Sequence, residues 1–235
     1  AKRVAKLIAD AIPENVPELA KYLKGDETFT DIQGHWAEDV IKTLAENDKV
    51  SGVGDGKFNP DGTVTRAEFL KMAMDSLGIV GHAYRDGECL DATNDDWYCY
   101  YLQGALDKDI IPEEMIEDCD FTNVTKTLKE STEKEKAVRA NVNVYTGKFY
   151  GDKPITREEM AVIATRCKNY KMRNWRDWDN ERRIPVFSFK DSDEIDEKYI
   201  SYVVHAYNLK YEDGRFAPKE NLTRAQAAVV MNNLK

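Results

Sequence analysis

The 235-residue sequence predicts a mainly α protein built from three copies of one helix-loop-helix unit. A short pattern recurs three times: Gly, a basic residue and Phe, then five residues, then an aliphatic residue and Thr-Arg. The copies are Gly56–Phe58 with Val64–Glu68, Gly147–Phe149 with Ile155–Glu159, and Gly214–Phe216 with Leu222–Gln226. Because the interval from Phe to Thr is the same in every copy, the pattern indicates a structural repeat whose apolar faces could pool around a shared centre.

The threonine of each copy is predicted to begin a helix. Thr followed three residues later by Glu or Gln is the capping box of a helix N-terminus, and apolar residues follow it at helical spacing. The capping pairs are Thr65 with Glu68, Thr156 with Glu159, and Thr223 with Gln226.

The arginine after each threonine is not explained by capping. Arg66, Arg157 and Arg224 fall in the first helical turn, where the helix dipole disfavours a cation. A helix N-terminus presents backbone N–H groups to anions, and an arginine adds a planar fork suited to carboxylate or phosphate. For one arginine, an ion pair with a neighbouring acidic residue or packing on an aromatic ring is the better explanation. Three arginines in one register favour an anion-binding site.

The first half of each unit carries an aromatic residue two positions before an aspartate, and then an amphipathic helix. These aspartates are Asp31, Asp86 and Asp191, and the helices are expected to start near Trp36, Trp97 and Tyr199. The predicted organisation is an N-terminal helical segment (1–28), repeat 1 (29–83), repeat 2 (84–170, with an insertion at about 112–143), a connector (171–186) and repeat 3 (187–235).

The repeated motifs resemble the S-layer homology (SLH) family. The first copy carries the whole family pattern: Phe29-Thr30-Asp31, Gly34-His35-Trp36-Ala37, Asp55-Gly56-Lys57-Phe58 and Thr65-Arg66-Ala67-Glu68. The second copy departs from it at Thr-Arg-Glu-Glu, and the third has Gln226 where Glu is usual. The resemblance implies a pseudo-threefold assembly around a shared helical core, with grooves between repeats.

The same resemblance implies a function. It implies a non-catalytic module outside the cytoplasmic membrane that anchors an S-layer or surface protein to the cell wall. The implied ligand is an anionic secondary cell-wall polysaccharide, often pyruvylated, or peptidoglycan. Two alternatives stay open: a protein-interaction or lattice-forming module that contacts other surface-layer proteins, and an accessory domain of a wall-active glycan hydrolase.

Candidate ligand contacts follow from this resemblance. The arginines would hold the carboxylate of a pyruvyl group, and Trp36 and Trp97 would stack on sugar unless they are core residues. The aspartates would accept sugar hydroxyls or orient the arginines, unless they only cap turns. Basic residues in one repeat position would add charge: Lys57, Lys148 and Arg215.

Composition restricts the other function classes. The net charge of −9 argues against non-specific nucleic-acid binding, which needs a basic surface, and any anion must be held by individually placed groups. The sequence has no apolar stretch of about 20 residues, so we expect no membrane insertion. One stretch resembles a calcium-binding loop, but Lys57 stands where the first Asp ligand belongs, so we expect no metal there. We expect no cofactor either.

The four cysteines fall within repeat 2 and suit one or two disulfides in an oxidising compartment. Sequence does not choose among the three pairings, and four thiols without any disulfide are the alternative. These cysteines are Cys89, Cys99, Cys119 and Cys167.

Overall fold

The computed structural model describes residues 29–47, 49–82, 90–93, 95–118, 147–172, 189–205 and 213–234. The predicted N-terminal helices, most of the insertion and nearly all of the connector lie outside these ranges. Within them the prediction of a mainly α protein is confirmed, with six α-helices and isolated β-bridges in place of strands. The chain forms two compact units, residues 1–60 and 61–235.

The first unit contains α3 (Glu38–Glu46), which buries Ile41 and Leu44 on one face. A loop after the helix turns back through Gly54 and Gly56, which both have positive φ angles. Phe58 ends this loop in full burial, with its ring centroid 5.2 Å from that of Phe29.

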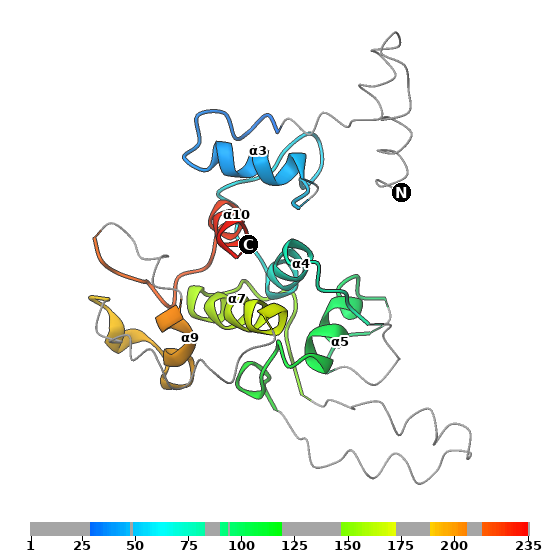
Figure 1. Cartoon of the computed structure of the whole chain (residues 1–235), viewed down its shortest axis with the longest axis vertical. Helices are drawn as coiled ribbons and strands as arrows, with labels where there is room; N and C mark the ends of the chain where they lie inside the picture. Colours follow the sequence, from blue (N-terminus) through cyan, green and yellow to red (C-terminus); the bar gives the residue numbers. More distant parts are fainter. Residues whose placement is uncertain are drawn as a thin grey trace. The chain divides into compact units, whose positions relative to one another are not determined.

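The second unit holds the remaining helices (Figure 1). In the middle, α4 packs on α7, while α5 and α10 pack on α4 and α9 packs on α7. The elements are α4 (Arg66–Ser76), α5 (Cys99–Asp107), η1 (Glu113–Met115), α7 (Arg157–Met172), η6 (Ser192–Glu194), η7 (Glu197–Tyr199), α9 (Ile200–His205) and α10 (Arg224–Asn233).

The predicted capping boxes are present at all three motif helices. Thr65 caps α4 and Thr223 caps α10, each with the reciprocal bond from its Glu or Gln partner. At α7 the Glu159 amide donates to the Thr156 hydroxyl at 3.4 Å, and the Thr156 amide donates to Glu159 at 3.2 Å. The helix starts are therefore determined locally by these pairs.

A closed ring of backbone hydrogen bonds joins the residues that precede these helices. The Val64 amide donates to the Leu222 carbonyl at 3.0 Å. The Leu222 amide donates to Ile155, and the Ile155 amide returns to Val64, both at 2.9 Å. All three side chains are fully buried. Backbone hydrogen bonds between buried residues thus link the three Thr-Arg motifs to one another within the second unit.

The cysteine and membrane predictions are resolved only in part. Cys99 and Cys167 are free thiols, so neither contributes the predicted disulfide, and burial raises the pKa of Cys167. Cys89 and Cys119 lie outside the described residues. Among the described helices, none is long and apolar enough to cross a membrane.

Candidate functional site

The motif arginines of the first two repeats have structural partners. Arg66 and Arg157 are each only 3% exposed. The Arg66 guanidinium forms a two-pronged ion pair with Glu159 and donates from Nη1 to the Phe149 carbonyl at 2.7 Å. Arg157 donates from Nε to the Phe216 carbonyl at 2.6 Å and lies over the Phe216 ring. Each arginine therefore reaches the Gly-basic-Phe loop of the following repeat.

The first amides of the motif helices are also occupied. Each motif arginine donates its backbone N–H to a carbonyl four residues after the Phe of another repeat. The pairs are Arg66 with Lys153 at 2.9 Å, Arg157 with Glu220 at 3.0 Å, and Arg224 with Gly62 at 2.9 Å. The second amides of α4 and α7 donate to Gly151 and Pro218.

This geometry differs from the predicted anion site. At the starts of α4 and α7, loop carbonyls already accept the backbone amides that an anion would need. The side chains of Arg66 and Arg157 donate to the same loops. Arg224 is also buried, at 8% exposure. Arg66 pairs with an acidic residue and Arg157 packs on an aromatic ring. These are the two structural explanations that the sequence offered for an isolated arginine.

An aspartate at the start of each repeat clamps the Phe loop. Asp31 accepts from the Phe58 and Asn59 amides at 2.8 and 2.7 Å. Burial alone would raise the pKa of Asp31, but these amides outweigh it and lower the pKa. In repeat 3 the buried carboxylate of Asp191 does the same for residues 216 and 217, at 2.9 and 2.7 Å. These two aspartates shape a turn.

The clamp of repeat 2 is Asp91, which sequence analysis missed. Its carboxylate accepts from the Phe149 and Tyr150 amides at 2.7 and 3.0 Å, 58 and 59 residues along the chain. The predicted residue, Asp86, lies outside the described residues. Asp91 follows Cys89-Leu90 and lacks the aromatic residue that marks the other two, so the pattern gave no signal there.

Both tryptophans that the sequence offered as ligand contacts are exposed. Trp36 is 66% exposed and Trp97 is 53% exposed, and each lies two residues before its helix. The next residues, Ala37 and Tyr98, are buried. The interpretation of these indoles as core residues is therefore wrong, and both rings are accessible to a ligand.

The basic residue before each core Phe is also exposed. Lys148 Nζ lies 3.4 Å from the Asp118 carboxylate, and Arg215 Nε lies 2.8 Å from that of Asp213. Lys57 is exposed in the first unit. The loop thus directs its Phe inward and its cation outward.

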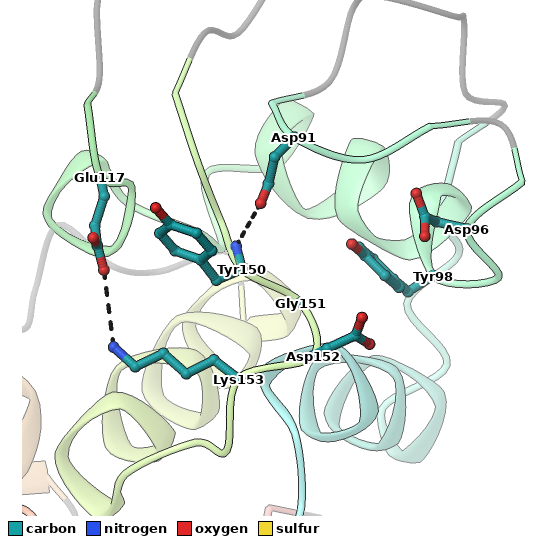
Figure 2. Close-up of a pocket in the computed structure, with 8 residues that line it drawn as sticks. All are labelled: Asp91, Asp96, Tyr98, Glu117, Tyr150, Gly151, Asp152 and Lys153. Carbon is teal, nitrogen blue, oxygen red and sulfur yellow. Dashed lines mark hydrogen bonds and ion pairs between the residues drawn. The ribbon is translucent and has the colours of Figure 1, made fainter.

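A pocket of about 550 Å³ opens beside the start of α4 (Figure 2). Tyr98 and Tyr150 supply its rings, and Lys153 lies 3.8 Å from Glu117 at one side. Its lining is Asp91, Asp96, Tyr98, Glu117, Tyr150, Gly151, Asp152 and Lys153.

Comparison with known families agrees with this repeat geometry. Residues 28–70, 142–161 and 188–228 match the family model of the S-layer homology domain. The three segments are S-layer homology repeats. Each matched segment contains a Phe loop and a Thr-Arg motif, and the second match covers only the latter half of its repeat. The structure supplies the unmatched half, where α5 and Asp91 take the places of α3 and Asp31.

Several curated proteins are similar to this chain over most of its length. An amylopullulanase of Thermoanaerobacterium thermosulfurigenes is 33% identical over 213 residues, which is 89% of this chain and 10% of the relative. Exoglucanase XynX of Acetivibrio thermocellus is 34% identical over 220 residues, 90% of this chain and 16% of the relative. An endoglucanase of Bacillus sp. (strain KSM-635) is 28% identical over 213 residues, 88% and 18%. The chain thus spans less than a fifth of each of these relatives.

The third SLH repeat departs from the other two at the tryptophan position. Its α9 starts at Ile200, so Lys198 holds the place of Trp36 and Trp97. Tyr199, which the sequence placed near the Trp position, is buried in the register of Tyr98, and its hydroxyl donates to the Glu114 carbonyl at 3.2 Å. Repeats 1 and 2 therefore have an exposed indole that repeat 3 lacks.

Proposed function

We propose that this chain is a non-catalytic module that anchors a larger protein to the cell wall outside the cytoplasmic membrane by binding wall polysaccharide. Three SLH repeats support cell-wall anchoring in general. The observation that carries the proposal is the exposure of Trp36 and Trp97 at one repeat position. Aromatic rings in water are costly to leave uncovered, and sugars present apolar C–H faces that cover them.

The proposed ligand is an anionic wall polymer, with a pyruvylated secondary polysaccharide as the first choice and peptidoglycan as the second. The chain carries a net charge of −9, so an anion must be met by individual cations. Exposed cations at one loop position are the best placed, namely Lys57, Lys148 and Arg215. We assign anion contact to these residues, and a structural role to Arg66 and Arg157 because their guanidiniums are buried and partnered.

We further propose that the three Thr-Arg motifs are related by an approximate threefold axis through the second unit. The closed bonds among Val64, Ile155 and Leu222 support it. The cyclic order of the amide contacts, from repeat 1 to 2, from 2 to 3 and from 3 to 1, supports it independently.

Sedimentation with purified, protein-free cell walls tests the anchoring proposal. We expect the wild-type chain to sediment, and Trp36→Ala and Trp97→Ala each to weaken binding, with the double variant weaker than either. Val80→Ala removes a side chain that is equally exposed but lies outside the tryptophan register, and should bind normally. A wild-type chain that stays in the supernatant would contradict anchoring and favour a protein-interaction module. Release of reducing sugar from the walls would indicate an enzyme.

Variants of the exposed basic residues test whether the bound polymer carries a pyruvyl carboxylate. Lys148→Ala and Arg215→Ala should weaken binding to walls that carry the pyruvylated polymer and leave binding to chemically depyruvylated walls unchanged. Equal losses on both kinds of wall would remove the carboxylate from the proposal while leaving anchoring intact.

A further inference from the structure

The pocket beside α4 has the wrong charge for a pyruvyl carboxylate. Four carboxylates and one ammonium line it (Figure 2). Asp91 uses both oxygens on backbone amides, and Asp96 accepts from the Thr93 amide and hydroxyl at 2.7 and 2.9 Å. The neutral N–H and O–H donors add no positive charge, so with one ammonium against four carboxylates the field in the pocket favours a cation.

Aromatic surface accompanies this charge. Tyr98 forms a buried wall, and a Cβ added at Gly151 would lie 2.5 Å from its Cζ, so the close approach of loop and ring requires glycine. Tyr150 is 37% exposed and offers a ring edge or face from the other side. Rings beside hydrogen-bond acceptors suit a sugar, whose C–H faces stack while its polar groups bond.

The pocket lies where repeats 1 and 2 meet, and the equivalent positions at the junction of repeats 2 and 3 form an internal ion pair. Lys219 follows Phe216 by three residues, as Asp152 follows Phe149. The Lys219 ammonium lies 2.6 Å from Asp196, and Asp196 follows its clamp aspartate by five residues, as Asp96 follows Asp91. An ammonium of the chain itself therefore occupies the second junction beside the counterpart of Asp96.

The first junction lacks this internal cation. Asp152 takes the place of Lys219 and points toward Asp96 and Tyr98 in Figure 2. Glu158, the second acceptor of the Lys219 ammonium at 2.6 Å, is replaced by Ala67. What remains is a pocket whose lining includes Asp96, the counterpart of Asp196, and Asp152 at the position of Lys219.

We propose that this pocket binds a hexosamine unit with a free amine, the ammonium lying between Asp96 and Asp152 and the ring lying against Tyr150. The inference rests on the proposed wall-glycan function and names a second ligand chemistry for it: an N-unsubstituted amino sugar in the wall polymer. The exposed cations and the pocket would then contact oppositely charged groups of one polymer.

Two oligosaccharides that differ only in the amine test this inference. Short chitosan oligomers and their fully N-acetylated counterparts share one backbone, so titration calorimetry at physiological salt isolates the charge. We expect the amine form to bind at least about tenfold tighter, a difference of about 1.4 kcal/mol. Asp152→Asn should remove most of this preference. Asp193→Asn, which neutralises an exposed carboxylate outside the pocket lining, should keep it and so controls for general attraction to an acidic protein.

A second variant copies the closed junction. Asp152→Lys should place an internal ammonium beside Asp96 and abolish binding of the amine oligomer, while the circular dichroism and melting temperature stay near wild type. Equal affinity for the two oligomers, or unchanged binding by Asp152→Lys, would overturn the inference. If walls still sediment with the wild-type chain in that case, anchoring stands and only the amine specificity fails. If walls do not sediment, anchoring itself fails.

Discussion

The guanidinium of Arg66 and the carboxylate of Glu159 form a buried ion pair that joins the first turn of α4 to the capping box of α7. The same carboxylate accepts the Thr156 amide, so one side chain both caps a helix and joins two repeats. The residue that the family motif supplies as a helix cap is thus also the counter-ion for the arginine of the preceding repeat.

Replacement of Arg66 by alanine should destabilise the second unit by about 3–5 kcal/mol, because it leaves Glu159 buried without its counter-ion. Chemical denaturation measures this. The matched control is Lys71→Ala on the same helix, whose pair with Asp75 is half-buried and still reached by water, so its loss should cost clearly less than the loss of the buried pair. A stable Arg66→Ala protein that no longer binds walls would instead assign this arginine to the ligand.

The two roles of Glu159 can be separated with variants that the chain itself suggests. Repeat 3 caps α10 with Gln226, so Glu159→Gln should keep the cap and lose only the ion pair. Glu159→Ala should lose both and cost about 1 kcal/mol more, which is the usual value of a cap. Gln226→Ala gives the cap loss alone. Equal unfolding free energies for the Gln and Ala variants of Glu159 would show that its cap contributes nothing.

Sequence reasoning succeeded where partners are close along the chain. The capping boxes join residues three apart, and the buried Phe loops have a fixed interval to the cap, so a local pattern contains the whole interaction. Sequence analysis identified the two indoles as candidate ligand contacts. It left open whether they face water or the core, because that depends on the exact residue at which each helix begins.

The arginine partners could not be predicted in this way. Arg66 binds Glu159 and Phe149, which lie 93 and 83 residues away, and only the arrangement of repeats brings them together. The helix N-termini were predicted as anion sites because their first amides have no acceptor within the helix. In the fold these amides donate to carbonyls of another repeat. Asp91 was missed since its function needs only a carboxylate at the right place, without the aromatic residue.

Acid should release the clamp of the first unit. The pKa of Asp31 is lowered from its ordinary value of 3.8, so the folded state binds the proton less readily than the unfolded chain. Its contribution to stability is therefore present above pH 3.8 and is lost as the pH falls through the lowered value. A titration of the Asp31 carboxyl by nuclear magnetic resonance should give a midpoint below 3.8, and Asp31→Asn should make the Phe58 and Asn59 amides insensitive to pH in this range. A midpoint at or above 3.8 contradicts the clamp.

Gly104 in α5 should be intolerant of substitution, although alanine is the better helix former. A Cβ at this position would lie 2.5 Å from the Gly81 Cα and 2.9 Å from the Gly81 carbonyl carbon, so backbone would have to move. Alanine improves helix propensity by about 1 kcal/mol in an exposed helix, whereas overpacking of a buried contact costs about 1–3 kcal/mol. Gly104 is buried against this segment, so the packing loss should exceed the propensity gain. Gly104→Ala should lower the melting temperature, and Gly104→Ser should lower it further. An increase with alanine would mean that α5 and the segment after α4 are not in contact in solution.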